Sequence, residues 1–141
     1  MLVIVERVAY LRHCALFADT PDRVLAGLAA ALDEVQFVAG EQLMETGAVE
    51  EWLYIVVSGE VEVTRPDRVV RLGPGAVVGE LAVLDPQARS ATVTALVPTF
   101  AFRLRKAAFD EALAARPEIA RGVIAELVRR LREPHEPPAS P

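Results

Sequence analysis

Hydrophobic positions recur with a helical period at both ends of the chain and lose that period in the middle. Near the start, Val5, Val8 and Leu11 predict a short helix. The segment Thr20-Pro21-Asp22 is typical of an N-cap, a proline at the first helical position and an acidic first turn. Apolar residues behind it keep the helical spacing, so a second helix is predicted over residues 21–32.

The last third of the chain predicts two more helices. The first is expected over residues 106–115, and Pro117 suits the first position of a second helix that runs to about Arg132. This last helix carries apolar residues at four-residue spacing, with two more beside them: Ile119, Val123, Leu127 and Leu131, then Ile124 and Val128. Such a broad apolar face is expected to pack in the core or to pair with a second copy of the chain.

The middle of the chain consists of short runs rich in valine, isoleucine, threonine and aromatic residues, separated by glycines. Strands are predicted over residues 34–38, 52–57, 60–65, 69–72, 91–96 and 99–104. Ser58-Gly59 predicts a tight hairpin between the second and third strands, and Pro66-Asp67 predicts the next turn. Many short strands with close turns favour a sandwich, a jelly roll or a small barrel over a parallel sheet. The predicted fold class is therefore α+β.

Composition narrows the class of protein further. A chain of 141 residues fits one domain, and its 52% of hydrophobic residues are enough for a sizeable core. The longest uncharged stretch, residues 90–102, is too short and too rich in threonine to span a bilayer. The apolar start lacks a basic region before it, so no signal peptide is expected.

Charge and cysteine content bear on partners and compartment. A net charge of −5 makes the chain a poor binder of polyanions, and Arg129-Arg130-Leu131-Arg132 complements the C-terminal end of a helix dipole. We expect no nucleic-acid binding, because no DNA-reading element follows Arg132. Cys14 is the one cysteine, which indicates a reducing compartment, the cytoplasm. His13-Cys14 is not a metal-ligand set, so Cys14 is interpreted as structural.

One segment carries groups suited to a phosphate and a sugar. Gly79 lacks a Cβ, which lets the backbone approach a ligand closely, and the next residues can form one helical turn whose N–H groups attract an anion. Arg89 would pair with the same anion bidentately, and Ser90 would add donors. Glu80 only accepts hydrogen bonds when it is ionised, which suits the vicinal hydroxyls of a sugar.

In these residues the chain resembles the cyclic nucleotide-binding domain family, which includes catabolite-type regulators, kinase regulatory subunits and ion channels. The resemblance covers roughly residues 16–131. It is carried by Gly40-Glu41, Gly47, Trp52-Leu53-Tyr54-Ile55-Val56-Val57-Ser58-Gly59-Glu60-Val61, Gly75, Gly79-Glu80-Leu81-Ala82 and Arg89-Ser90-Ala91-Thr92-Val93. It implies an antiparallel β-roll (a double-stranded β-helix or jelly roll) flanked by N- and C-terminal helices.

The resemblance also implies a role for each residue of the phosphate-binding segment. Arg89 would pair with the cyclic phosphate, and the Ser90 hydroxyl with backbone amides around Leu81, Ala82 and Ser90 would complete the cradle. Asp85 adds a negative charge nearby that would weaken the site. The hydroxyl of Ser90 is compatible with adenine and with guanine.

The ribose and the base have their own implied contacts. Glu80 would bind the ribose 2′-hydroxyl beside Gly79. Val123 and Leu127, on the last helix, would cover the base. Val78 and Ala88 replace the phenylalanine and the proline common in the family, and neither change removes a polar group that contacts the ligand.

These observations together predict a non-enzymatic regulatory module that binds a cyclic nucleotide, cAMP in preference to cGMP, and transmits binding through its last helix. The alternative is a degenerate fold that serves as a structural or dimerisation module without ligand. An enzyme has no support, since the chain lacks a G-x-S-x-G motif and its β region lacks histidines for a metal. Neither a metal nor a catalytic cofactor is expected.

The predicted organisation has three parts. Residues 1–15 form an N-terminal helical segment, residues 16–133 the cyclic nucleotide-binding domain, and residues 134–141 a disordered proline-rich tail. The expected partners are the cyclic nucleotide, a second copy through the C-terminal helix and an output domain in a longer parent chain. Direct membrane insertion is not expected.

Overall fold

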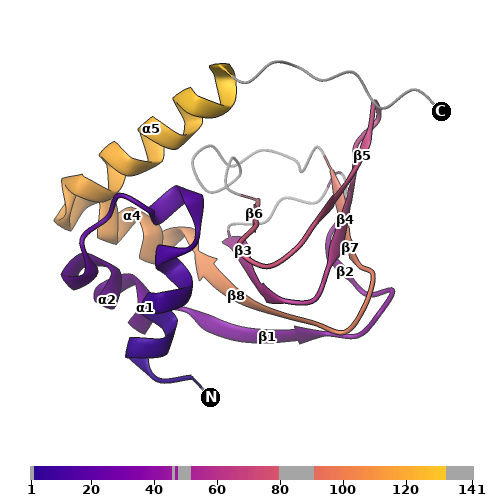
Figure 1. The fold of residues 1–141 in the computed structure, drawn as a ribbon, viewed down its shortest axis with the longest axis horizontal. Helices are drawn as coiled ribbons and strands as arrows, with labels where there is room; N and C mark the ends of the chain where they lie inside the picture. Colours follow the sequence, from indigo (N-terminus) through magenta and orange to yellow (C-terminus); the bar gives the residue numbers. More distant parts are fainter. Residues whose placement is uncertain (1, 46, 48–51, 80–90, 133–141) are drawn as a thin grey trace.

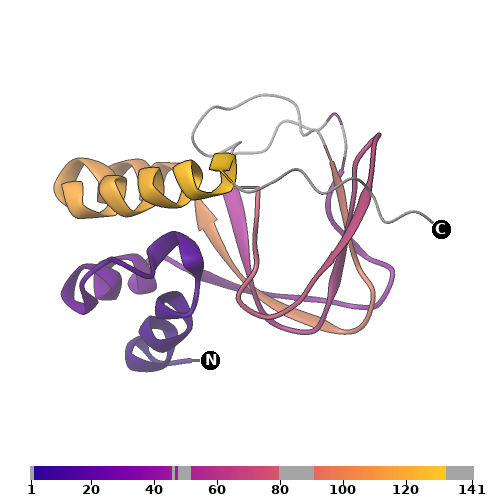
Figure 2. The same cartoon turned by 45° about the horizontal axis from the view of Figure 1, so that its top comes forward.

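Two four-stranded antiparallel sheets form a roll, and the helices pack together against one of them (Figure 1). The computed structural model describes residues 2–45, 47, 52–79 and 91–132. The view in Figure 2 shows the N-terminal and C-terminal helices gathered on the same side of the roll. The predicted α+β β-roll with flanking helices is confirmed.

The helices agree closely with the sequence periodicity. The elements before the roll are α1 (Ile4–Arg12), the 3₁₀ turn η1 (Ala15–Phe17) and α2 (Asp22–Ala30), and those after it are α4 (Lys106–Ala115) and α5 (Pro117–Arg132). Labels follow Figure 1. The last two helices have the predicted bounds, and Pro117 begins α5 as expected.

Each sheet combines strands from distant parts of the chain. The helix-facing sheet has the order β1 (Asp33–Phe37), β8 (Thr99–Arg105), β3 (Trp52–Ser58) and β6 (Val77–Val78). The outer sheet has the order β2 (Gln42–Met44), β7 (Thr92–Ala95), β4 (Val61–Thr64) and β5 (Val69–Leu72). The short strands β2 and β6 are absent from the sequence prediction.

The predicted hairpin at Ser58-Gly59 is wrong. β3 pairs with β6 and β8, whereas β4 pairs with β5 and β7, so the chain crosses from one sheet to the other at this point. Gly59 has a φ of +99°, and a Cβ there would lie 2.8 Å from the carbonyl oxygen of Pro98. The glycine permits this close crossing. The hairpin at Pro66-Asp67 is confirmed, because β4 and β5 pair directly across it.

The buried residues form two clusters on opposite faces of the helix-facing sheet. The helix-side cluster contains Leu11, Cys14, Leu16, Phe17, Val24, Leu25, Leu28, Ala29, Leu32, Leu53, Ile55, Phe102, Leu104, Phe109, Ile119 and Val123. The roll cluster, between the sheets, contains Phe37, Leu43, Met44, Tyr54, Val56, Val61, Val63, Val78, Ala91, Val93, Ala95 and Ala101. Successive residues of β3 alternate between the two clusters, as strand geometry requires.

A buried arginine fastens α1 to α2 and to β1. Arg7 is 6% exposed and donates hydrogen bonds from one nitrogen to the carbonyl oxygens of Ala29 and Leu32, at 2.9 and 3.0 Å. Its other terminal nitrogen lies 2.9 Å from a carboxylate oxygen of Glu34. The Arg7 hydrogen bond, helped by the N–H of Leu2, holds the pKa of Glu34 below its ordinary value.

The predicted N-cap of α2 is displaced by one residue. The cap position is Pro21, whose carbonyl oxygen accepts the N–H of Leu25 at 3.0 Å. Thr20 is instead buried, and its hydroxyl has no hydrogen-bond partner among the described residues. A Cβ placed on Gly122 would lie 3.5 Å from that hydroxyl oxygen. The threonine therefore contributes to the contact with α5 rather than to a helix cap.

Candidate functional site

The predicted phosphate-binding segment starts at the end of β6, an edge strand of the helix-facing sheet. Val78 pairs with Tyr54 of β3 and is 5% exposed in the roll cluster. Gly79 follows with a φ of +87°, in the left-handed region that favours glycine. The chain thus leaves the sheet through a turn that a residue with a side chain would strain.

The same segment ends at an inner strand of the other sheet. β7 lies between β2 and β4, and Ala91, just before it, is 5% exposed. Ala91 and Val93 belong to the roll cluster, as does Val78 at the other end. Residues 80–90 therefore connect two strands whose ends are buried in one apolar cluster between the sheets.

Most residues predicted to bind the ligand lie in this connection. Glu80, Leu81, Ala82, Arg89 and Ser90 are outside the described residues, so their roles stay predictions. The structure describes Gly79 at the entrance of the segment, and the predicted lid residues on α5.

The two lid residues lie on the helix side of the sheet. Val123 is 3% exposed within the helix-side cluster, and Leu127 packs against the same cluster. Ile124 and Val128, on the neighbouring stripe of α5, are 60% and 39% exposed. Val123 is therefore part of the core in this conformation. To cover a base bound in the roll, it would have to move together with α5.

Close packing holds α5 in this position. A Cβ on Gly122 would lie 3.7 Å from the carbonyl oxygen of Leu16, in η1. On another stripe of α5, Glu126 is buried and accepts hydrogen bonds from Arg129 at 2.6 and 3.0 Å. Gly122 therefore allows α5 to pack closely on η1. The buried carboxylate of Glu126 is paired with Arg129 on the same helix.

A row of polar and aromatic side chains on β1, β3 and β8 was missed in the sequence. Arg103 pairs across the sheet with Tyr54 on one side and Asp33 on the other, so the three share the face that lines the roll. The guanidinium of Arg103 lies 5.3 Å from the ring centre of Trp52 and 3.3 Å from the carboxylate of Asp33. These residues come from three strands far apart in sequence, and only the pairing register brings them together.

The structure also bears on metal binding, on membrane insertion and on the role of Cys14. Over the described ranges, no three histidine, cysteine, aspartate or glutamate side chains come together to hold a metal ion. No helix in the same part of the chain is long and apolar enough to cross a membrane. Cys14 is fully buried in the helix-side cluster, which confirms its structural interpretation.

A β-roll of two antiparallel sheets with helices gathered on one side is the architecture that this chain shares with regulatory domains of known structure. Residues 34–116, more than half of the chain, match the family model of the cyclic nucleotide-binding domain. The chain belongs to the cyclic nucleotide-binding domain family. Within the described residues, the matched region runs from the second residue of β1 through β8 and includes α4.

Relatives of this chain include bacterial regulators. It is 30% identical over 128 residues to the "CRP-like cAMP-activated global transcriptional regulator" of Mycobacterium tuberculosis, covering 86% of this chain and 57% of that protein. It also resembles the crystal structure of the N-terminal domain of a transcriptional regulator from Streptomyces coelicolor A3(2). There the TM-score is 0.74 and the identity 36%, covering 87% of this chain and 90% of the other.

A third relative is a subunit of a protein kinase. The "regulatory subunit of a cAMP-independent protein kinase A" from Trypanosoma brucei has a TM-score of 0.77 and 27% identity, covering 93% of this chain and 48% of that one. The chain spans 57% of the mycobacterial regulator and about half of the trypanosomal subunit. These relatives are regulatory proteins.

Proposed function

We propose that this chain is a regulatory module that binds a 3′,5′-cyclic nucleotide in the β-roll, with cAMP preferred over cGMP. Arg89 pairs with the cyclic phosphate, and Ser90 with the backbone amides around Leu81 and Ala82 completes the cradle. The mycobacterial relative is a cAMP-activated regulator, which supports the preference for cAMP.

The ribose is held at the start of the same segment. Glu80 accepts the ribose 2′-hydroxyl, and Gly79 lets the backbone come close to the sugar. The observation that carries the proposal is the placement of the segment's two ends. Val78 and Ala91 lie in one cluster between the sheets, which supports binding at that point of the roll.

Ligand binding is transmitted through the C-terminal helices. β8 runs into α4 without a connecting loop, since Arg105 is both the last residue of β8 and the cap residue of α4. When α5 moves toward the roll, Val123 and Leu127 leave the helix-side cluster and cover the base. Removing one buried valine from its cluster costs about 1.5–3 kcal/mol, so ligand contacts have to replace that burial.

The alternative is the same fold without a ligand. The trypanosomal relative, a regulatory subunit of a cAMP-independent kinase, has a similar fold and shows that this fold occurs in a protein that does not depend on cAMP. In that case the segment 80–90 is structural, and the exposed Ile124 and Val128 of α5 serve self-association.

The proposal extends to compartment and assembly. A lone, buried Cys14 supports a reducing environment such as the cytoplasm, and the exposed stripe of α5 supports a homodimer through that helix. An output domain in a longer parent chain, a role without catalysis and the absence of a catalytic cofactor complete the proposal.

Titration calorimetry with Arg89→Ala tests the phosphate contact. Removing one partner of a buried charge pair costs about 2–5 kcal/mol, so the affinity for cAMP should fall by a factor of about 30 to several thousand. Arg68→Ala is the matched control, because Arg68 is exposed in the β4–β5 turn. Equal affinity of wild type and Arg89→Ala for cAMP would contradict the proposed phosphate site. Absence of cAMP and cGMP binding in the wild type would favour the alternative.

A further inference from the structure

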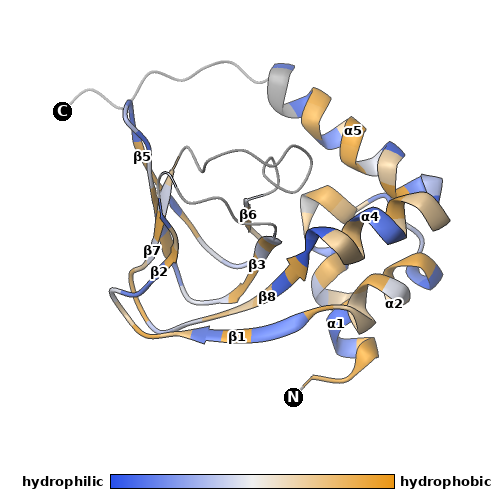
Figure 3. Cartoon of the chain, turned by 180° about the vertical axis from the view of Figure 1, so that it is seen from behind, coloured by the Kyte–Doolittle hydropathy of each residue, from blue (hydrophilic) through white to orange (hydrophobic). Residues whose placement is uncertain are grey.

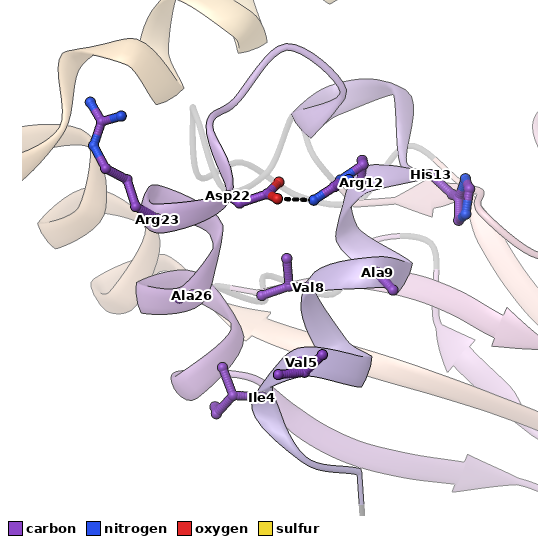
Figure 4. Close-up of a pocket in the computed structure, with 9 residues that line it drawn as sticks. All are labelled: Ile4, Val5, Val8, Ala9, Arg12, His13, Asp22, Arg23 and Ala26. Atoms are coloured by element: carbon purple, nitrogen blue, oxygen red, sulfur yellow. Dashed lines mark ion pairs between the residues drawn. The ribbon is translucent and has the colours of Figure 1, made fainter.

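An open groove of about 570 Å³ lies between α1 and α2, on the side of these helices away from the roll cluster (Figure 4). Its floor on α1 consists of Ile4, Val5, Val8 and Ala9, and α2 contributes the small Ala26. The volume is in the range of ordinary ligand and peptide sites.

The apolar residues of α1 form one broad face that runs from the core to the groove. Leu11 lies fully buried in the helix-side cluster, and Val8, which also lines the groove, packs against that cluster. Ile4, Val5, Val8 and Ala9 recur at intervals of one and four residues, which places them on one stripe of the helix. Ile4 is 39% exposed and Val5 is 79% exposed, although both are large and apolar.

The exposed apolar surface of this region is concentrated where α1 begins. Val3, just before the helix, is 61% exposed, whereas Tyr10 lies on another side of α1, where its ring meets Phe102. Figure 3 shows the hydrophobic colour at the start of α1. A small ligand buries most of its surface in an enclosed pocket, whereas an open, elongated apolar strip is the kind of site into which an amphipathic helix docks.

One end of the groove is cationic. Arg12, Asp22 and Arg23 line it, and Asp22 forms an ion pair with Arg12, so Arg23 supplies the net positive charge. Arg23 is exposed and has no ion pair within the part of the chain that the structure describes. This cationic end stands out in a chain whose net charge is −5. It would attract carboxylates on a docked segment.

The charges of the chain's own amphipathic helix disfavour a second copy as the occupant. The exposed side of α5 carries Arg121 and Arg132 beside Ile124 and Val128, so α5 of another copy would bring arginines to the cationic end. We propose that the α1–α2 groove docks an amphipathic helix of another protein or domain, with an apolar ridge along the groove and carboxylates at the Arg12–Arg23 end. This proposal does not depend on nucleotide binding.

Fluorescence anisotropy with designed peptides tests the surface and its charge preference. The probe is a labelled peptide of about 18 residues, long enough for a helix, with leucines at i, i+3, i+4 and i+7 and glutamates in its first two turns. A second peptide has lysines in place of those glutamates. We expect saturable binding of the glutamate peptide to the full chain and binding of the lysine peptide at least about tenfold weaker.

Two pairs of variants locate the binding. Val5→Glu should weaken the glutamate peptide about tenfold or more, while Val69→Glu, an exposed valine on β5, should stay within about twofold. Arg23→Glu should reverse the preference between the two peptides, while Arg68→Glu, on the β4–β5 turn, should leave it unchanged. Circular dichroism of each variant verifies that the chain remains folded.

Three outcomes overturn the proposal. The first is no saturable binding of the glutamate peptide, or binding that Val5→Glu and Val69→Glu weaken equally. The second is a dimer in sedimentation experiments that Val5→Glu dissociates, which assigns the groove to a second copy. The third is displacement of the peptide by a small acidic amphiphile such as laurate at lower concentration than by unlabelled peptide, which assigns it to a lipid.

Discussion

The two apolar clusters share one sheet and differ in the size of their side chains. The largest fully buried side chains of the described residues are phenylalanines, leucines, isoleucines and one valine, Val56. All of them except Val56 belong to the helix-side cluster. The roll cluster consists mainly of valines and alanines, with Phe37 and Tyr54 in an edge-to-face contact at 5.6 Å. Larger buried side chains contribute more to the free energy of unfolding, so the helix-side cluster provides most of the stability of the fold. The smaller side chains of the roll cluster contribute less, which leaves the roll as the region that can serve a function.

The shared strands explain how these two regions communicate. β3 and β8 form the centre of the helix-facing sheet and contribute alternate residues to each cluster. Leu53 and Ile55 pack on the helices, whereas Tyr54 and Val56 face the roll. A displacement of the roll face therefore acts on the helix side through the same two strands.

Phe102→Ala should produce the largest loss of stability. Phe102 is fully buried and contacts the rings of Tyr10 and Phe100, so its truncation should cost about 3–5 kcal/mol in the free energy of unfolding. Phe37→Ala removes the same side chain from the roll cluster, where Phe37 is 9% exposed, and should cost less than about 3 kcal/mol. Urea unfolding measures both. Equal losses of stability in the two variants would contradict the difference between the two clusters.

Gly59→Ala should produce an intermediate loss at the corner where the chain changes sheets. The added Cβ would lie 2.8 Å from the carbonyl oxygen of Pro98 and from the Cα of Thr99, at a positive φ, so we expect a loss of about 1–3 kcal/mol. Gly73→Ala is the control. A Cβ on Gly73 would have nothing within 4 Å, so that variant should be neutral or slightly stabilising in the same unfolding assay. A Gly59→Ala protein as stable as wild type would contradict the geometry of the crossing.

Glu34→Gln should have the smallest effect and a characteristic pH dependence. The pKa of Glu34 is lowered by Arg7, so the unfolded chain takes up the proton first as the pH falls. The carboxylate therefore stabilises the fold above its ordinary pKa of 4.5, and this contribution is lost at lower pH.

Urea unfolding between neutral pH and about pH 3 measures this dependence. The stability difference between wild type and Glu34→Gln should shrink as the pH falls. Glu62→Gln removes an exposed pair with Arg71 and should cost at most about 1 kcal/mol. A difference for Glu34→Gln that grows with acidity would contradict the assigned sign.

The sequence predicted where the helices and strands lie better than it predicted which strands pair with one another. α4 and β5 have the predicted bounds, because a strong periodicity or clear turns limit them on both sides. β2 and β6 are three and two residues long, too short for any periodicity to appear. Ser58-Gly59 indicated a turn correctly, but turn chemistry does not say which strands pair, and that depends on the long-range register.

The same difference between local and long-range information applies to the candidate site. Local sequence predicts a site at Gly79 and the segment that follows it, because a glycine and an arginine suited to a phosphate are close together in the chain. The Trp52, Arg103 and Asp33 row depends on pairing between three strands and has no local signal. The burial of Val123 in the helix-side cluster likewise depends on how α5 packs on η1.

Melting temperatures with millimolar cAMP, cGMP and AMP, beside a sample without ligand, test the central claim most directly. A ligand at about 100 times its dissociation constant stabilises the folded state by about 2.7 kcal/mol, which is a shift of several degrees for a domain of this size. The account predicts such a shift with cAMP, a smaller one with cGMP, and none with AMP or with cAMP added to Arg89→Ala. Absence of any shift in the wild type, or equal shifts with cAMP and AMP, would contradict a cyclic nucleotide site in the roll.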